Sequence, residues 1–123
     1  MEHFSVLLVD DEAELVYTLA ERLVIRGCDA AAATSSGDAL KILAEKKFDV
    51  VVLDVKMPGM SGIELMRAIK KTNPQIKIIL QTGRGSIEES KEGIREGAFD
   101  YLVKPVQIDD LIKKMKQALG KPS

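Results

Sequence analysis

Short apolar stretches alternate with longer amphipathic segments along the whole chain of 123 residues. Five of the apolar stretches are brief and bounded by polar or turn-forming residues, and they are therefore predicted to be β-strands. The first and third are apolar at nearly every position, which is typical of strands covered on both faces of a sheet. The predicted strands are residues 4–9, 28–34, 48–53, 76–81 and 100–103.

A segment with helical periodicity follows each predicted strand. In the first such segment Leu15, Leu19 and Leu23 recur every four residues and so form one apolar face. Ser36 and Ser61 precede the second and third helical patterns and are the expected N-caps. Strict alternation of strand and helix predicts an α/β fold, in which a parallel sheet carries helices on both faces.

The second strand is predicted against its composition. Residues 30–33 are four alanines, which favour a helix by intrinsic propensity. We nevertheless assign residues 28–34 to a strand, because the segment is short and the alternation requires a strand there. The complete pattern accounts for one domain over residues 1–123, with a core over about residues 4–119.

Composition narrows the possible functions. Lys and Arg number 18 against 19 Asp and Glu, so the formal net charge of -1 gives no sign of a nucleic-acid partner. No apolar run approaches the roughly 20 residues that cross a bilayer, and the N-terminus lacks the basic region of a signal peptide. Cys28 is the only cysteine, which favours a reducing, cytoplasmic location. The only histidine, His3, gives almost no support for histidine-based catalysis.

Chemically versatile side chains stand at the ends of four predicted strands. The carboxyl ends of parallel strands lie at one edge of a sheet, where open α/β sheets bind their ligands. Three neighbouring carboxylates repel one another unless a proton or a cation intervenes, and Mg²⁺ prefers such oxygen ligands. A hydroxyl and an ammonium group beside them suit a phosphoryl group, and a carboxylate can itself attack phosphorus. The residues are Asp10 and Asp11 after the first strand, Asp54 after the third, Thr82 after the fourth and Lys104 after the fifth.

Each of these residues also has a simpler structural interpretation. Asp10 and Asp11 are of a type common at helix N-termini, and Asp54 precedes a stretch rich in turn residues. Thr82 and Lys104 are then an ordinary strand-end hydroxyl and an ordinary loop lysine. The interpretation as one site is favoured because it explains all five residues at once.

Four stretches of the sequence resemble the receiver domain of two-component response regulators. The resemblance covers essentially the whole chain, and the stretches occur in the family's order and at its spacing. It implies a flavodoxin-like, CheY-like sheet of order 2-1-3-4-5 and a phosphorylation-dependent signalling switch. The stretches are "LLVDDE" (7–12), "VVLDVKMPGMSGIEL" (51–65), "QTGRGS" (81–86) and "GAFDYLVKP" (97–105).

The resemblance implies a role for each residue at the predicted edge. Asp54 matches the aspartate that a histidine kinase phosphorylates, and Lys104 matches the lysine that contacts the phosphoryl group. Asp11 is then expected to bind Mg²⁺ directly, and Asp10 to bind it through water. The backbone carbonyl of Lys56 matches a further metal ligand.

Other residues match positions that transmit or time the signal. Thr82 is expected to move toward the phosphoryl group and Tyr101 to turn inward with it, which reshapes the surface of the fourth helix, fifth strand and fifth helix. Lys56 and Arg84 stand two residues after Asp54 and Thr82, at positions thought to tune loss of the phosphoryl group. We hypothesise that both long basic side chains screen the acyl phosphate from water or pair with its oxygens.

The implied partners are a histidine kinase or phosphotransfer protein and a downstream protein target or output domain. No direct contact of this chain with nucleic acid or a membrane is expected. The protein is not expected to be an enzyme, apart from catalysing its own phosphorylation and dephosphorylation. Its context stays open between a stand-alone receiver and a receiver cut from a longer regulator or hybrid kinase.

One alternative function is a small aspartyl-phosphate phosphatase or phosphotransferase of the haloacid-dehalogenase-like type. That class also uses an aspartyl phosphate on an α/β sheet with Mg²⁺. It separates its nucleophile and its acid by one residue after the first strand, whereas Asp10 and Asp11 are adjacent. It also needs a cap over the substrate, for which 123 residues leave little chain. The switch is therefore the favoured prediction.

Overall fold

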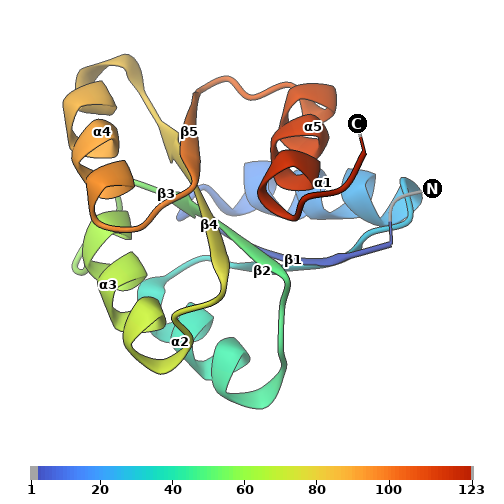
Figure 1. The fold of residues 1–123 in the computed structure, drawn as a ribbon, viewed down its shortest axis with the longest axis horizontal. Coiled ribbons are helices and arrows are strands. Elements are labelled where there is room, and N and C mark those ends of the chain that lie inside the picture. Colours follow the sequence, from blue (N-terminus) through green and yellow to red (C-terminus); the bar gives the residue numbers. More distant parts are fainter. Residues whose placement is uncertain (1–2, 123) are drawn as a thin grey trace.

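A five-stranded parallel sheet forms the centre of the protein in the computed structural model, which describes residues 3–122 (Figure 1). The strands stand in the order β2-β1-β3-β4-β5, and every neighbouring pair is parallel. The predicted fold class and strand order are therefore confirmed. The strands are β1 (Ser5–Val9), β2 (Asp29–Ala33), β3 (Val50–Asp54), β4 (Lys77–Thr82) and β5 (Asp100–Val103).

Helices cover both faces of the sheet. α1 and α5 pack on one face, and α2, α3 and α4 pack on the other (Figure 1). Within residues 3–122 no helix is both long and apolar enough to cross a membrane. The helices are α1 (Ala13–Ile25), α2 (Ser36–Glu45), α3 (Gly62–Thr72), α4 (Ile87–Arg95) and α5 (Ile108–Ala118), and a 3₁₀ turn, η1 (Arg84–Ser86), leads into α4.

The central strand β3 contributes to both halves of the core. All of its residues are buried; Val51 and Leu53 pack with α2 and α3, whereas Val50 and Val52 pack with α1 and α5. Burial on both faces explains why this stretch is apolar at nearly every position. Because β1 lies beside β3 in parallel register, the two carboxyl ends are held next to each other on a rigid support.

The strand β2 forms despite its alanines. It pairs in parallel with β1 over its full length, at one edge of the sheet, and α1 and α2 both contact it. Alanine side chains are small enough to let both helices approach this edge strand closely. Pairing with β1 and packing of the helices thus override the helix propensity of the sequence.

The helix N-caps were predicted correctly in one case and wrongly in another. Ser61 caps α3 in a capping box, in which its side chain and that of Glu64 each accept the other's backbone N–H. For α2 the cap is Ser35, whose Oγ accepts the N–H of Asp38, and Ser36 is the first helical residue. Two consecutive serines are chemically equivalent as caps, so the sequence alone does not separate them.

The first residue of α3 touches the end of β3. Gly62 is buried and donates its N–H to the carbonyl oxygen of Val55 at 3.0 Å. A Cβ atom on Gly62 would overlap the backbone carbonyl oxygen of Asp54, so only glycine fits there. Gly59, in the turn before it, has a φ of 75°, which also favours glycine. This turn therefore folds α3 directly onto the strand end that carries Asp54.

Candidate functional site

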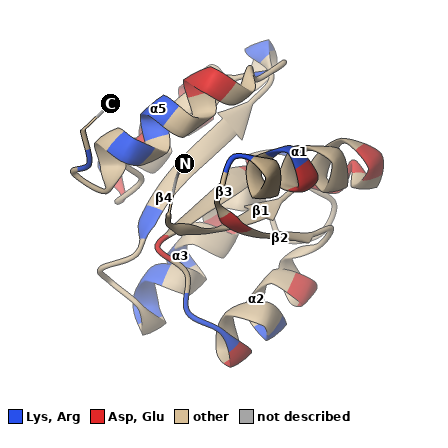
Figure 2. Ribbon diagram, turned by 90° about the vertical axis from the view of Figure 1, so that its right-hand side faces the viewer, with Lys and Arg blue, Asp and Glu red and all other residues tan. Residues whose placement is uncertain are grey.

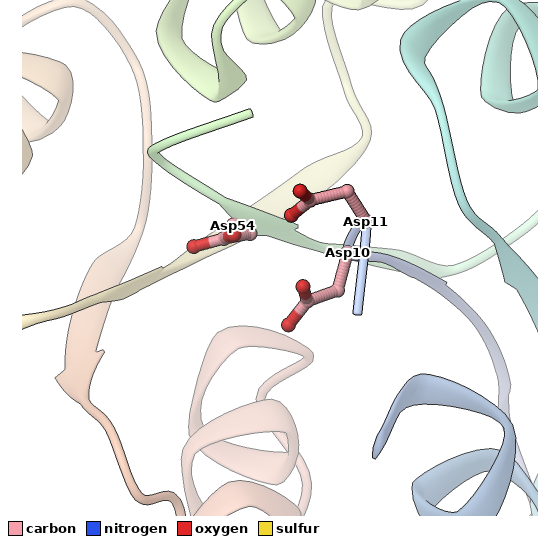
Figure 3. A group of neighbouring side chains, drawn as sticks. All are labelled: Asp10, Asp11 and Asp54. Atoms are coloured by element: carbon pink, nitrogen blue, oxygen red, sulfur yellow. The ribbon is translucent and has the colours of Figure 1, made fainter. Parts of the chain in front are cut away.

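Three aspartate side chains converge at the carboxyl edge of the sheet (Figure 3). Asp10 and Asp11 follow β1 directly, and Asp54 is the last residue of β3. Each offers a carboxylate oxygen, and these oxygens all lie within 4.8 Å of one another. Asp10 and Asp54 are only 4% and 6% exposed, whereas Asp11 is exposed. The structure thus brings the three predicted carboxylates together.

Burial, more than net charge, sets this cluster apart from the other charged residues. Acidic and basic residues both occur on α1, α2 and α5, mostly at exposed or half-buried positions (Figure 2). An exposed charge keeps its hydration, but a buried carboxylate loses it and needs a compensating partner. Two buried carboxylates side by side are therefore a functional feature to explain.

The ammonium group of Lys104 reaches the cluster from the end of β5. Its Nζ lies 2.7 Å from Asp10 Oδ2 and 3.4 Å from Asp54 Oδ1. A third carboxylate oxygen, Glu12 Oε1, lies 3.4 Å from the same Nζ. The peptide bond from Lys104 to Pro105 is cis. One lysine is therefore shared among several acidic side chains.

Burial and charge displace the pKa values of the site. Burial, and then the charge of Asp10, raise the pKa of Asp54 to about 6, against the opposing effect of Lys104. For Lys104 burial favours the neutral amine, but the hydrogen bond and charge of Asp10, with the charges of Asp54 and Glu12, outweigh it and raise its pKa. The attraction of Lys104 thus does not fully offset the burial of Asp54 and the charge of Asp10.

The donor set fits a hard divalent cation. Mg²⁺ takes oxygen ligands, typically a few carboxylates together with waters, and Asp10, Asp11 and Asp54 offer converging carboxylate oxygens. Burial is the largest cause of the raised pKa of Asp54 and the charge of Asp10 is the next, and a bound cation would favour the ionised carboxylate against both. These three side chains are consequently the ones that would hold the metal.

The simpler helix-capping interpretation does not describe the acidic pair. The N-cap of α1 is Glu12, which makes no side-chain capping hydrogen bond. Asp10 Oδ1 accepts the backbone N–H of Glu12 at 3.0 Å and so shapes the turn between β1 and α1. Its other oxygen accepts a hydrogen bond from Lys104. Asp10 therefore joins the turn to the acidic cluster.

Thr82 and Tyr101 lie on the neighbouring strands β4 and β5. Thr82 ends β4 with its side chain fully buried, and its Oγ1 donates to the carbonyl oxygen of Gly83 at 2.9 Å. Tyr101 is half-buried, stands opposite Leu80 in the β4–β5 register, and packs against the core on the α3 side of the sheet. The threonine hydroxyl thus lies at the same sheet edge as the aspartates.

Lys56 and Arg84 lie in two connections at this edge. Lys56 is exposed between β3 and α3, and its Nζ pairs at 2.8 Å with Oε1 of Glu89 in the first turn of α4. Arg84 is exposed and begins η1. Nothing in the sequence spacing signals the contact to Glu89, because it depends on where α4 packs.

Two further polar residues border the site and were not predicted. Glu12 shares Lys104, and Gln81 is buried and stands opposite Asp54 in the β3–β4 register. Both line a groove between α1 and the segment after β5, together with Asp10 and Lys104. Their positions gave a signal: Glu12 follows the acidic pair directly, and Gln81 is a polar residue at the end of an apolar strand.

The fold and the site together define a doubly wound α/β domain with an acidic, lysine-bearing pocket at its carboxyl edge. The chain belongs to the response regulator receiver domain family, whose family model matches residues 6–116. It is therefore a receiver domain of the two-component type.

Curated relatives extend the comparison to longer proteins. The chain is 35% identical over 119 residues to the uncharacterized transcriptional regulatory protein YkoG of Bacillus subtilis, covering 97% of the chain and 52% of that protein. It is 40% identical over 116 residues to the transcriptional regulatory protein ZraR of Salmonella typhimurium, covering 94% of the chain and 26% of that protein. The chain thus spans about half the length of YkoG and about a quarter of the length of ZraR.

Solved structures of receiver domains match nearly end to end. A response regulator receiver domain protein from Clostridium thermocellum superposes with a TM-score of 0.90 at 36% identity, covering 95% of this chain and 94% of that one. The receiver domain of NtrX from Brucella abortus superposes with a TM-score of 0.88 at 31% identity, covering 95% of this chain and 99% of that one. The flavodoxin-like receiver fold is thereby confirmed.

Proposed function

We propose that this receiver domain is a phosphorylation-dependent signalling switch in which Asp54 accepts the phosphoryl group. The observation that carries the proposal is the setting of Asp54, a buried carboxylate 3.4 Å from Lys104 and grouped with Asp10 and Asp11. Phosphoryl transfer depends mainly on positioning and on neutralising charge. The strand ends provide the positioning, while the lysine and a cation held by the aspartates provide the neutralisation.

In the proposed reaction a carboxylate oxygen of Asp54 attacks the phosphorus of a phosphohistidine on a histidine kinase or phosphotransfer protein. The new O–P bond forms as the N–P bond breaks, and the leaving imidazole takes up a proton. Lys104, already at the edge of the cluster, pairs with a phosphoryl oxygen. Asp11, Asp54 and the carbonyl of Lys56 would bind Mg²⁺ directly and Asp10 through water, and the ion would offset charge on the phosphoryl oxygens.

A covalent adduct on Asp54 is the first expected result. When the protein is incubated with acetyl phosphate and Mg²⁺, its intact mass should increase by one phosphoryl group, and chelation of the metal should prevent the increase. The nearly isosteric variant Asp54→Asn should remain unmodified, because its amide is not a nucleophile. An equal adduct on Asp54→Asn, or one that forms without metal, would refute the proposal.

The haloacid-dehalogenase-like alternative finds no support among the matched relatives and structures. Turnover separates the two functions directly. A switch is labelled once and decays slowly, whereas a phosphatase releases phosphate from many substrate molecules per protein molecule. Catalytic release of phosphate from a phosphomonoester would therefore favour the alternative.

Thr82 and Tyr101 relay phosphorylation to the surface formed by α4, β5 and α5. The Thr82 hydroxyl exchanges the Gly83 carbonyl for a phosphoryl oxygen, and the half-buried Tyr101 then turns inward. The local hydrogen bond of Thr82 supports this step, because a rotation of one side chain is enough to exchange it. The position of Tyr101 on the adjacent strand links that movement to β5.

Removal of either side chain should uncouple the switch without preventing phosphorylation. Thr82→Ala and Tyr101→Ala should both form the adduct on Asp54, yet lose most of the phosphorylation-dependent change in amide hydrogen exchange along α4 and β5. Thr82→Ser is the matched control, since it keeps the hydroxyl and should switch. Full exchange changes in both alanine variants would exclude the two residues from the relay.

Lys56 and Arg84 are proposed to set the lifetime of the aspartyl phosphate. Both are long, exposed cations in the connections that follow Asp54 and Thr82. Both connections lie at the carboxyl edge of the sheet, where the phosphoryl group would be attached. The charge of the two side chains would then slow the access of water to phosphorus.

Residues 1–123 are proposed to act as one receiver domain, with its output made by protein contact. The groove beside Lys104, bordered by the exposed apolar residue Leu15, offers a phosphodonor protein a docking surface next to Asp54. Because the relatives are up to about four times longer, the same domain is proposed to signal to an output domain in a longer regulator, or to a separate target protein. A cytoplasmic location is part of this proposal.

A further inference from the structure

The ion pair between Lys56 and Glu89 joins the two sides of the phosphorylation site. Lys56 lies in the connection after β3, two residues beyond Asp54, and Glu89 lies in the first turn of α4. The 2.8 Å contact directs the Lys56 ammonium toward α4. By contrast, the charges that move the pKa of Asp54 are those of Asp10, Lys104 and Asp11.

We propose that Glu89 is a positioning residue that holds the Lys56 ammonium on α4 and thereby shortens the lifetime of the phosphoryl group on Asp54. The inference rests on the proposed phosphorylation of Asp54. It adds a residue of α4, outside the acidic cluster, that decides how often Lys56 is available to the phosphoryl oxygens.

The strength of the pair suits a side chain that changes partners. Lys56 and Glu89 are 66% and 47% exposed at their side chains, and an exposed ion pair of this kind is weak. A phosphoryl group on Asp54 would add a second anion near Lys56 and compete with Glu89 for the ammonium. Lys56 therefore divides its time between Glu89 and the phosphoryl oxygens, where it would hinder the approach of water.

The same contact explains a specific consequence of losing Glu89. Without the Glu89 carboxylate, Lys56 is released from α4 and is free to pair with the phosphoryl group, so the aspartyl phosphate should last longer. The effect must vanish when Lys56 is absent, because Glu89 acts through it. This dependence separates a positioning role from a general effect of removing one negative charge.

The experiment measures the half-life of the adduct on Asp54 after removal of the phosphodonor. Glu89→Gln should lengthen the half-life about two- to fivefold, the range that an exposed ion pair can supply. In the Lys56→Ala background, Glu89→Gln should leave the half-life unchanged. Glu88→Gln is the matched control, because Glu88 lies in the same first turn of α4 but pairs with Lys91, and it should leave the half-life unchanged.

A second readout tests the pair without phosphorylation. The side-chain NMR signals of Lys56 should shift in Glu89→Gln and stay in place in Glu88→Gln. A normal adduct whose half-life is unchanged or shortened in Glu89→Gln, or lengthened equally with and without Lys56, would overturn the inference alone. Failure of the wild type to form any adduct on Asp54 would instead overturn the proposed function, and this inference with it.

Discussion

Replacing Gly62 with alanine is expected to lower the free energy of unfolding by about 3 kcal/mol, the upper part of the range for overpacking a buried position. The added Cβ atom would overlap the backbone carbonyl oxygen of Asp54, and it would also crowd the Cα atom of Val55 at 3.0 Å. Backbone atoms of a central strand cannot turn aside as the end of a flexible side chain can. The strain must therefore separate α3 from β3 or displace Asp54 itself. Urea unfolding of the two proteins, followed by circular dichroism, measures the difference.

Gly37, which also lies in the first turn of a helix but has open space around it, provides the control. Gly37 lies in the first turn of α2, and among residues 3–122 no atom beyond its chain neighbours and the backbone of its own helix lies within 4 Å of the Cβ atom that alanine would add there. Gly37→Ala should be neutral or raise the free energy of unfolding by about 0.5 kcal/mol, because alanine is the better helix former. Equal stabilities for Gly62→Ala and Gly37→Ala would show that the contact of Gly62 with Asp54 is not tight. A folded Gly62→Ala protein should also form the Asp54 adduct more slowly, since its acceptor is displaced.

The strands and helices could be predicted because they depend on local patterns, whereas the strand order 2-1-3-4-5 was implied only by the resemblance to receiver domains. Continuous apolar residues such as Val50 to Leu53 indicate a strand buried on both faces. The alternation of strands and helices predicts a parallel sheet with helices on both faces. The alanine strand shows the limit of composition, since pairing with β1 decides its structure. The cap of α2 shows a smaller limit: Ser35 and Ser36 are equally suitable, and only the path of the chain selects Ser35.

The acidic cluster could also be predicted, because parallel strands bring their carboxyl ends to one edge whatever the detailed packing. The pairing of Lys56 with Glu89 could not. It depends on how closely α4 approaches the sheet, which is governed by Gly93: a Cβ atom there would lie 2.6 Å from Leu80 Cδ1 and 2.7 Å from Ile63 Cδ1. Contacts between a loop and a helix depend on how the helix packs on the sheet, and no periodicity in the sequence predicts that packing.

Replacing Asp54 with asparagine is expected to stabilise the protein in the absence of divalent metal, by about 1 to 3 kcal/mol at neutral pH. The upper figure counts the whole displacement of the Asp54 pKa from 3.8 to about 6, and the lower one discounts it for water that still reaches the carboxylate. The physical cause is burial of a charge next to Asp10. Asparagine removes the charge with little change of shape, and Lys104 keeps its partners Asp10 and Glu12.

The pH dependence of this stabilisation has a definite sign. The pKa of Asp54 is near 3.8 in the unfolded chain and near 6 in the folded protein. Between these two pH values the folded protein binds more protons at Asp54 than the unfolded chain does. The wild type therefore loses stability as the pH rises through this window. The advantage of Asp54→Asn should therefore be absent at pH 3.5, grow up to about pH 6.5 and stay constant above it. Urea unfolding of both proteins across this pH range, in the presence of a chelator, measures the difference in the free energy of unfolding. Asp11→Asn is the control: it removes an exposed charge with a smaller effect on the pKa of Asp54, so it should gain less stability.

Saturating Mg²⁺ should reverse the order of stability at neutral pH, so that the wild type becomes more stable than Asp54→Asn. A cation that binds only the folded state adds stability in proportion to its occupancy, and it binds best where Asp54 supplies a charged oxygen. The wild type should gain more from the metal than Asp54→Asn does, because the variant offers one carboxylate fewer. If Asp54→Asn were no more stable than the wild type in chelator, the burial of Asp54 would cost nothing. The conflict among the three carboxylates would then give no reason for a metal to bind there.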